Sequence, residues 1–397
     1  VVSTILPNLP QAYFTIWGGE AAGIVNPINP MLEPEIMADI MNAAGTKLLV
    51  TLAPFIGTDI WQKTASIADQ VPTLETILQV DLANYLTTVK KLAVRWMLYR
   101  SDRGRPKIET PVYDFGKMAR RYSGEKLLSR RQFKPDDIAS YFHTSGMTGV
   151  PKLAQHTHFN EVFDAWSAAN VISMSADDKV FCGLPLFHVN GAILSGLMPW
   201  IKGASVVLGS PSGYRSESIV PNFWAIVDYY QINFFSGEPT LFSSLLNVPL
   251  GEADISSLEY ALCTASPMSV EDFHPFEERT TISILESYGL TEGSGISSVN
   301  PLGGEKRVGS AGFRLPYQEM KVVKLDSEGK YLNDCATDEV GMIIIRGPNV
   351  FAGYQDKSQI RRVWVDTGDG HGPWFNSGDL GREDAQGYFW LSAQERR

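Results

Sequence analysis

Short runs of β-branched and other apolar residues alternate with longer amphipathic stretches over much of the first 300 residues. The runs have the length and composition of buried strands, and they lie at residues 2–6, 47–51, 180–182, 204–208, 232–235, 258–262 and 282–285. Stretches with helical periodicity lie between several of them, at residues 33–44, 160–172, 216–230 and 239–246. This alternation predicts doubly wound, mainly parallel sheets, which place ligands on loops at the carboxyl ends of their strands.

The pattern changes after about Gly303. The later strand-like segments are separated by Gly, Asp and Asn turns with little helical periodicity, and they lie at residues 320–325, 342–346 and 388–391. They predict a small antiparallel β unit. We therefore expect an α/β fold in which residues 1–306 form two doubly wound, mainly parallel sheet subdomains. Residues 307–397 are expected to form a small antiparallel, β-barrel-like subdomain.

A basic segment is inserted near residues 84–134. Its apolar residues recur at helical spacing with lysines and arginines between them, and they are Leu86, Val89, Leu92, Ala93, Trp96 and Met97. Residues 90–134 contain 14 Lys or Arg and four acids, a formal charge of +10 that leaves −20 on the remainder. A basic amphipathic helix with a Trp could make a weak contact with an anionic membrane surface through residues 86–131. The sequence favours the alternative, an insertion that packs its apolar stripe on the domain, because such helices are common.

The composition is that of an ordinary globular protein. Of the 397 residues, 44% are hydrophobic and 20% are charged, which argues against extensive disorder. The net charge of −10 disfavours nucleic acid as a partner. No apolar stretch approaches the roughly 20 residues that cross a bilayer, and the first residues carry no secretory signal. We expect a cytoplasmic location, with peripheral membrane contact as an open alternative.

The metal-binding residue types are sparse. The three cysteines lie far apart without a C-x-x-C pair, which indicates neither a disulfide framework nor a structural zinc site and suits a reducing compartment. His156 and His158 alternate along the chain, but no third ligand is near them in the sequence. We therefore interpret both histidines as ordinary polar residues.

The segment from His143 to Lys152, with the sequence HTSGMTGVPK, has the composition of a phosphate-binding loop. Its glycines allow tight turns and bring backbone N–H groups close to an anion. Hydroxyl groups of Thr144, Ser145 and Thr148 add neutral donors, and Lys152 adds a positive charge. The loop does not match G-x-x-x-x-G-K-[ST], so it is not the ordinary nucleotide-kinase loop. Taken alone, it is also consistent with a surface turn.

Four motifs together resemble those of the adenylate-forming superfamily, which includes acyl- and aryl-CoA synthetases, luciferases and the adenylation domains of peptide synthetases. The signature loop of that family is similar to HTSGMTGVPK, and its acyl-pocket motif to PLFHVNG. Its adenine and metal motif resembles ESYGLTEGSG, and its ribose-binding segment resembles WFNSGDLGREDAQGYFWL. The family's early strand–helix–strand unit is similar to ILPNLPQAYFTIWGGEAAGIVNPINP. Any one motif is weak evidence, but their order and spacing extend through nearly the whole chain.

The resemblance implies an AMP-forming acid–thiol ligase of the acyl-CoA synthetase kind. With ATP and Mg²⁺ it would activate a carboxylic acid, most simply a fatty acid, to an acyl-AMP, and it would then transfer the acyl group to CoA. The implied catalytic residues are Thr144, Lys152, His188, Thr291 and Glu292. The implied nucleotide contacts are Ser145, Gly146, Thr148, Gly149, Ala265, Ser266, Pro267, Ser287, Tyr288, Gly289 and Asp379. The implied metal ligand is Glu292.

The residue types suit these roles. By analogy, Tyr288 stacks on adenine, Thr291 meets the α-phosphate and Glu292 holds Mg²⁺, which prefers hard oxygen ligands. Asp379 can accept both ribose hydroxyls, as acids do in other nucleotide sites. His188 matches a position at the mouth of the carboxylate pocket. Each motif also has a purely structural alternative, namely a capped turn, a turn aspartate or a core histidine.

The chain departs from the family pattern at several positions. Met147 stands where Ser or Thr is usual, Thr264 where Gly is usual, and Met342 where Glu is usual. Gln394 occupies the position of a ribose-contacting Arg, and Arg396 the position of the hinge. By the resemblance, a C-terminal lid domain with the adenylation Lys would come next, and we expect it to be absent from this chain. We therefore expect the large N-terminal part of such an enzyme, which binds nucleotide and turns over poorly by itself.

Two alternatives stay open at this point. An acyl-AMP ligase that delivers its acyl group to a carrier protein would share the same motifs. A degenerate, non-catalytic nucleotide-binding protein would account for Met147 and Gln394. The sequence specifies neither the acid and its chain length nor the oligomeric state.

Overall fold

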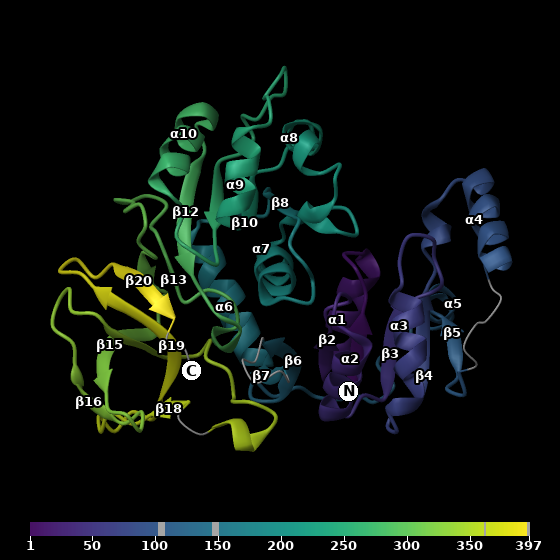
Figure 1. Cartoon of the computed structure of the whole chain (residues 1–397), viewed down its shortest axis with the longest axis horizontal. Coiled ribbons are helices and arrows are strands. Elements are labelled where there is room, and N and C mark those ends of the chain that lie inside the picture. Colours follow the sequence, from purple (N-terminus) through teal and green to yellow (C-terminus); the bar gives the residue numbers. More distant parts are fainter. Residues whose placement is uncertain (102–107, 145–150, 361–362, 395–397) are drawn as a thin grey trace. The chain divides into compact units, whose positions relative to one another are not determined.

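The structure, a computed structural model, describes residues 1–101, 108–144, 151–360 and 363–394 (Figure 1). The chain divides into two compact units, Val1–Gln155 and His156–Arg397, and each is described by itself. Each unit contains a sheet of mainly parallel strands, and the second unit also contains an antiparallel sheet.

The first unit is built on a seven-stranded sheet with the order β5-β4-β3-β1-β2-β6-β7. Neighbouring strands from β5 to β6 are parallel, and the order reverses at β1, as in a doubly wound sheet. The strands are β1 (Val2–Ile5), β2 (Val25–Pro27), β3 (Leu48–Leu52), β4 (Thr76–Val80), β5 (Val112–Asp114), β6 (Ile138–Thr144) and β7 (Lys152–Thr157). The helices are α1 (Pro10–Ala22), α2 (Pro34–Ala44), α3 (Ile60–Ile67), α4 (Thr88–Ser101) and α5 (Phe115–Arg121), with short 3₁₀ turns η1 (Ala68–Gln70) and η2 (Leu82–Tyr85).

Two helices of the first unit have boundaries that their sequences explain. α1 and α2 begin at Pro10 and Pro34, where a proline loses no hydrogen bond because the first N–H groups of a helix have no partner within it. α2 is followed by Gly45, whose φ of 68° lies in the left-handed region that favours glycine and ends the helix.

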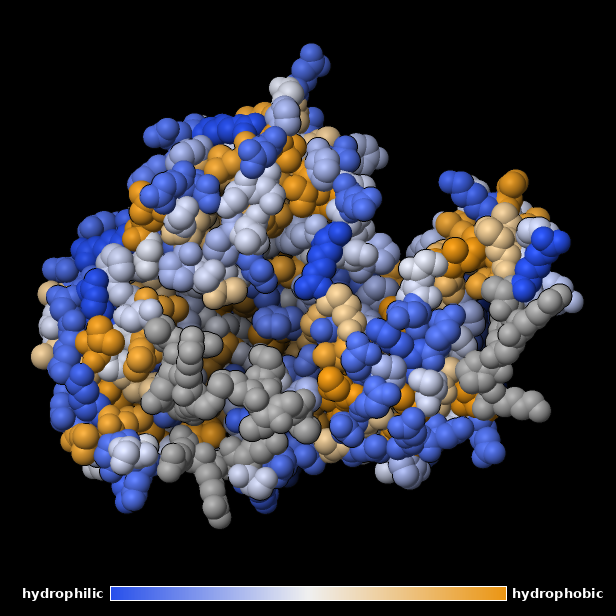
Figure 2. All heavy atoms as spheres, viewed as in Figure 1, coloured by the Kyte–Doolittle hydropathy of each residue, from blue (hydrophilic) through white to orange (hydrophobic). Residues whose placement is uncertain are grey.

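The basic segment forms a helix, α4, but its apolar stripe does not pack on the domain. Val89, Leu92 and Trp96 are 78%, 63% and 56% exposed, and Figure 2 shows hydrophobic residues on the surface over α4, at the upper right. The half-buried positions of the helix are instead Lys91, Val94 and Leu98. The favoured interpretation of this stripe as a buried face is therefore wrong.

The second unit contains a seven-stranded sheet with the order β14-β13-β12-β11-β10-β8-β9. Neighbouring strands from β8 to β12 are parallel, and β13 and β14 are antiparallel. The strands are β8 (Lys179–Cys182), β9 (Ser205–Leu208), β10 (Phe234–Gly237), β11 (Tyr260–Cys263), β12 (Ser283–Tyr288), β13 (Ser298–Val299) and β14 (Phe313–Arg314). The helices are α6 (His158–Val171), the π-helix η3 (Asn190–Leu197), α7 (Met198–Lys202), α8 (Phe223–Tyr230), α9 (Pro239–Leu246) and α10 (Val270–Thr280), with 3₁₀ turns η4 (Gly213–Arg215), η5 (Val220–Asn222) and η6 (Thr291–Gly293).

The antiparallel sheet of the second unit has the order β16-β15-β17-β19-β18, with β20 paired to β19. Its strands are β15 (Glu319–Leu325), β16 (Tyr331–Asp334), β17 (Gly341–Arg346), β18 (Trp364–Val365), β19 (Trp374–Glu383) and β20 (Phe389–Gln394), with a 3₁₀ turn η7 (Lys357–Ile360). Two mainly parallel sheets and one antiparallel sheet confirm the predicted fold class. The domain boundary placed near residue 306 stays a prediction.

Aromatic residues form the core beside the second parallel sheet. Phe223, Phe235 and Phe242 are fully buried. The ring centroids of Phe223 and Phe235 are 4.9 Å apart, and those of Phe235 and Phe242 are 5.4 Å apart. Phe235 therefore connects helices α8 and α9 to strand β10 by ring packing, which fixes the strand whose carboxyl end leads to the candidate site.

We expect Phe235→Ala to lower the free energy of unfolding by about 3–5 kcal/mol, because the change removes a buried ring and leaves a cavity. Urea unfolding followed by tryptophan fluorescence measures the loss. Tyr229→Ala, at a residue of the same unit that is 80% exposed, is the control and should cost less than about 0.5 kcal/mol. Equal losses for the two variants would contradict this description of the core.

Candidate active site

The predicted site residues of the second unit lie at the carboxyl ends of neighbouring parallel strands. β10, β11 and β12 are in register at Gly237, Cys263 and Glu286. The residues that follow these positions therefore lie toward the same edge of the sheet, where parallel α/β sheets bind ligands. The predicted residues gathered there are Ala265, Ser266, Pro267, Ser287, Tyr288, Gly289, Thr291 and Glu292.

The loop after β11 is exposed and has an unusual backbone conformation. Ala265, Ser266 and Pro267 are all exposed, and Ala265 has a φ of 76°, in the left-handed region that non-glycine residues rarely adopt. Strained backbone of this kind clusters at ligand sites. Thr264 accepts a hydrogen bond from the Asn190 side chain at 3.2 Å. Thr264, which stands where the family pattern has Gly, thus connects this loop through its hydroxyl to the segment that contains His188.

A buried hydrogen bond connects the adenine motif with the ribose motif. The Tyr288 hydroxyl donates to an Asp379 carboxylate oxygen at 2.6 Å, and the two residues are only 6% and 9% exposed. Burial, followed by the nearby Asp379 carboxylate, raises the pKa of Tyr288 well above its usual value, so the hydroxyl keeps its proton. The backbone of Asp379 pairs across β19 and β20 with that of Gln394. Gln394 is therefore directly opposite the proposed ribose ligand in the backbone register.

The turn η6, which contains Thr291 and Glu292, is held from two sides. The Nε2 atom of His156 lies 2.7 Å from the Thr291 carbonyl oxygen, and because a carbonyl can only accept, Nε2 must be the donor. The Tyr354 hydroxyl donates to the Glu292 carboxylate at 2.5 Å. His156 is fully buried, and its Nδ1 atom lies 3.4 Å from the Glu161 carboxylate. These contacts fix both the backbone of the turn and the direction of the Glu292 side chain.

The amide of Asn349 binds the other end of this turn. It donates to the carbonyl oxygens of Gly293 and Ile296 at 3.2 and 3.3 Å and to the Gln318 side chain at 2.6 Å. Asn349 is fully buried. The NH2 group of one buried amide thus lies within hydrogen-bond distance of three acceptors and connects two distant segments of the chain.

Gly289 is at a position with no room for a side chain. A Cβ atom there would lie 1.8 Å from the carbonyl oxygen of Gly295. The chain between Tyr288 and Gly295 therefore folds back on itself closely, with the Ser297 N–H donating to the Tyr288 carbonyl at 2.8 Å. The close approach explains the glycine in the predicted adenine motif by packing alone.

Glu286 is a buried acid that fixes the edge of the sheet. Its carboxylate accepts hydrogen bonds from the backbone N–H groups of Met268 at 2.9 Å and Gly309 at 2.6 Å. Burial raises its pKa above the usual value, and the two backbone donors act against that rise. Glu286 thereby ties the loop after β11 to β12.

His188 lies in a segment that continues into the π-helix η3. The residue is exposed, but the neighbouring protein atoms desolvate the imidazole and lower its pKa below the usual value. The backbone N–H of Asn190 donates to Nδ1 of His188 at 3.3 Å. Asn190 also accepts from Ser236 at the end of β10 at 3.1 Å. These bonds place a neutral imidazole in the segment bound to the loop after β11.

The structure describes only the two ends of the predicted phosphate loop. Thr144 ends β6 and Lys152 begins β7, so the two residues flank it in the first unit. Ser145, Gly146, Thr148 and Gly149, together with Met147, lie outside the described residues, as does Arg396.

Four residues that position the site were not predicted from the sequence, namely His156, Glu286, Asn349 and Tyr354. Glu286 lies directly before the predicted SYG sequence, and an acid in an apolar strand was a signal that could have identified it. No local sequence pattern identifies Asn349 or Tyr354. Their partners Gly293 and Glu292 are 56 and 62 residues away in the sequence and belong to another element. Among the described residues no group of three or more His, Cys, Asp or Glu could by itself hold a metal ion.

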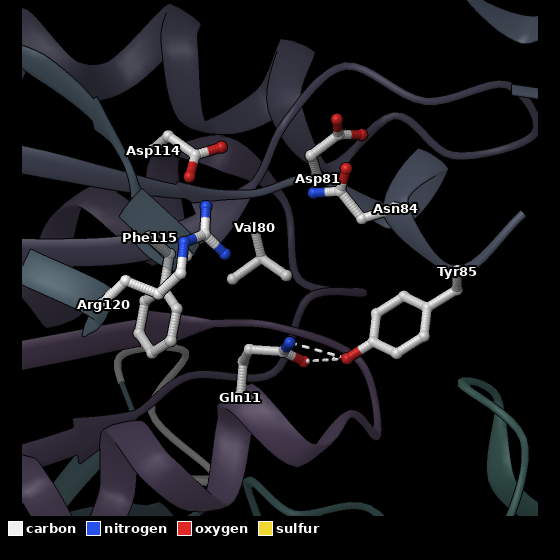
Figure 3. Close-up of a pocket in the computed structure, with 9 residues that line it drawn as sticks. Gln11, Val80, Asp81, Asn84, Tyr85, Asp114, Phe115 and Arg120 are labelled. Carbon is white, nitrogen blue, oxygen red and sulfur yellow. Dashed lines mark hydrogen bonds between the residues drawn. The ribbon is translucent and has the colours of Figure 1, made fainter. Parts of the chain in front are cut away.

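A separate pocket lies in the first unit and contains none of the predicted site residues. It has a volume of about 240 Å³ and lies at the carboxyl ends of β4 and β5 (Figure 3). Gln11 and Tyr85 are hydrogen bonded across one side of it, as Figure 3 shows. Asp81 and Asp114, which also line it, accept bonds from the backbone N–H groups of helical turns. The polar groups of this pocket therefore serve local structure.

Comparison with known proteins identifies relatives over the whole chain. The profile of the family described as AMP-binding enzyme matches residues 1–355. The chain is 32% identical over 405 residues to a marinolic acid–CoA ligase of Pseudoalteromonas, covering all of this chain and 57% of that protein. It is 28% identical to a long-chain-fatty-acid–CoA ligase of Bacillus subtilis, again over the whole chain and 68% of the relative. The chain thus spans little more than half to two thirds of the length of these relatives.

Solved structures share the fold. An anthranilate–CoA ligase in complex with anthranoyl-AMP superposes with a TM-score of 0.78 at 22% identity, over 99% of this chain and 68% of that one. ATP-bound MatB from Rhodopseudomonas palustris superposes with a TM-score of 0.75 at 19% identity, over the same shares of the two chains. At these identities the likeness concerns the fold alone.

The pH dependence of stability tests the buried network beside η6. Asp164 is fully buried next to Gly295 and Ile296, and burial raises its pKa well above the usual value. The folded state then binds a proton that the unfolded state releases, so stability falls as pH rises above the unfolded pKa, by up to about 1.4 kcal/mol per pH unit. We expect Asp164→Asn to remove this fall between about pH 4 and the raised folded pKa.

Urea unfolding at a series of pH values measures the slope. Asp177→Asn, at an exposed position just after the same helix, is the matched control and should keep the slope of the unchanged protein. A slope that is the same in all three proteins would show that Asp164 does not stay protonated in the folded state.

Proposed function

We propose, from the premise that this chain belongs to the AMP-binding enzyme family, that it activates a carboxylic acid with ATP and passes the acyl group to CoA. The observation that carries the proposal is the 2.6 Å hydrogen bond between Tyr288 and Asp379, because it joins the segments expected to hold base and ribose. The CoA acceptor is supported by the names of the relatives. The long-chain-fatty-acid–CoA ligase among them supports a fatty acid as substrate.

In the proposed complex, adenosine binds at the carboxyl edge of the second parallel sheet. The Tyr288 ring stacks on the base while its hydroxyl orients Asp379, whose carboxylate accepts hydrogen bonds from the ribose. The exposed loop of Ala265, Ser266 and Pro267 borders the nucleotide. The other proposed nucleotide contacts are Thr144, Ser145, Gly146, Thr148, Gly149, Lys152, Ser287 and Gly289.

Glu292 fits the role of a Mg²⁺ ligand. Its carboxylate is a hard oxygen donor at a partly exposed position, and Mg²⁺ in nucleotide sites commonly takes one or two carboxylates together with phosphate oxygens. The bound ion would neutralise phosphate charge. Tyr354 holds the carboxylate in one direction through the 2.5 Å hydrogen bond, and His156 holds the adjacent Thr291 carbonyl. The proposed role of the Thr291 hydroxyl is to bind the α-phosphate.

The first reaction is an in-line displacement at phosphorus. A carboxylate oxygen of the acid attacks the α-phosphorus, the bond from that phosphorus to the bridging oxygen breaks, and pyrophosphate leaves with the electron pair. Lys152 and Thr291 stabilise the charge on the phosphate oxygens. His188, kept neutral by its lowered pKa, orients the carboxylate without adding a competing positive charge. In the second reaction the CoA thiolate attacks the acyl carbonyl carbon and AMP leaves.

Binding of ATP tests the nucleotide site directly. We expect Asp379→Asn to weaken ATP binding about tenfold, since a charge-assisted hydrogen bond to ribose becomes a neutral one. Isothermal titration with ATP and Mg²⁺ measures the affinity. Asp366→Asn, at an exposed turn, is the matched control and should bind as the unchanged protein does. An absence of heat with the unchanged protein at millimolar ATP would instead support a degenerate, non-catalytic protein.

Acid-dependent exchange of pyrophosphate into ATP tests the chemistry and the substrate. We expect exchange to rise with the chain length of a series of fatty acids, and His188→Ala to lower it about tenfold or more with ATP affinity unchanged. The measurement uses the chain joined to the C-terminal domain of a relative. His274→Ala, at an exposed histidine, is the control. Normal ATP binding without exchange for any acid would refute the proposed activation, and acyl transfer to a carrier protein but not to CoA would refute the proposed acceptor.

A further inference from the structure

Helix α4 presents a row of apolar residues to solvent. Val89, Leu92, Trp96 and Tyr99 recur at intervals of three and four residues and therefore share one side of the helix. They are 78%, 63%, 56% and 79% exposed, and hydrophobic residues lie on the surface over α4 in Figure 2. Single exposed apolar side chains are ordinary, whereas a contiguous row of them along a helix indicates a surface that binds a partner.

Helix α4 contacts the preceding turn on the side opposite the exposed row. The Lys91 ammonium donates to the Asn84 side chain at 2.7 Å, and the Arg95 guanidinium lies 3.9 Å from the Asp81 carboxylate. The half-buried positions of the helix are Lys91, Val94 and Leu98. The side of the helix with Lys91, Val94 and Leu98 therefore faces the protein, and the row of larger apolar residues faces solvent.

Basic groups surround the exposed row. Lys90, Arg95 and Arg100 are exposed, and the guanidinium of Arg100 lies over the Trp96 ring at 4.2 Å from its centroid. The sequence of α4 contains no acidic residue. A tryptophan with adjacent cations on an apolar face is the composition of helices that lie in the interfacial region of an anionic bilayer.

We propose that α4 docks on an anionic lipid surface, with Val89, Leu92, Trp96 and Tyr99 among the acyl chains and headgroups. The charge decides between this occupant and a second copy of the chain, because pairing two such faces would bring cationic helices together without acids between them. None of the described helices is long and apolar enough to cross a membrane. The 14 residues of α4 span about 21 Å, less than a hydrocarbon core, so the helix lies along the surface.

Co-sedimentation with vesicles tests the proposal. One set of vesicles contains phosphatidylcholine and phosphatidylglycerol in equal parts, and the other contains phosphatidylcholine alone. We expect the chain to bind the first set more tightly than the second, and added salt to weaken that binding. Leu92→Ser with Trp96→Ser should lower the binding about tenfold or more, and Lys90→Gln should lower it about fivefold.

Two controls separate the lipid contact from general effects. Tyr229→Ala removes an aromatic residue of similar exposure outside the basic segment and should bind like the unchanged chain. Lys330→Gln removes an exposed lysine outside it and should do the same. Circular dichroism and urea unfolding establish that each variant is folded.

Three results would overturn the proposal. The first is no difference in binding between the two sets of vesicles. The second is vesicle binding that Leu92→Ser with Trp96→Ser leaves unchanged. The third is a dimer in solution that the same double variant converts to a monomer without any lipid binding, since the face would then contact a second copy. None of these results depends on whether the chain activates an acid.

Discussion

The hydrogen bond between Tyr288 and Asp379 is the interaction on which the proposed site depends. It crosses 91 residues of sequence and joins the last residue of a parallel strand to the middle of an antiparallel one. Both groups are nearly buried, and a buried carboxylate or hydroxyl without a partner costs more than the bond itself contributes. The bond therefore lowers the cost of burying both groups, and it joins the two sheets of the second unit at the proposed nucleotide site.

The remaining polar groups around the site follow the same physical rule. Several buried polar groups near η6 have partners from another element, and the side chains of Asn349, His156 and Tyr354 supply them. These bonds hold the backbone of the turn in place and add little charge to the site, since most of the acceptors are backbone carbonyls. The side chains expected to contact substrate are thus held by residues that are not themselves expected to touch it.

The fold could be predicted where the hydrophobic pattern was long enough to carry a signal. Buried runs such as those of β3 and β12 identified parallel strands, and the loss of helical periodicity identified the antiparallel sheet. Strands β13 and β14 have two residues each, too few for any period, and they were not predicted. The helix α4 was predicted, but its exposed face was not, because spacing alone does not tell which side of a helix is covered.

Candidate site residues could be proposed from the sequence where they are adjacent in it, as in Ser287 to Glu292, and the roles given to them stay predictions. Residues that reach the candidate site from distant elements could not be proposed in this way. His156 was interpreted as an ordinary polar residue because its partner, the Thr291 carbonyl, is a backbone group with no sequence signal. The lack of room at Gly289, where an added Cβ atom would lie 1.8 Å from a carbonyl oxygen, has a genetic consequence as well. Every missense change at that codon adds at least a Cβ atom, so substitutions that count as mild elsewhere, such as alanine or serine, should be as rare there among functional alleles as large ones.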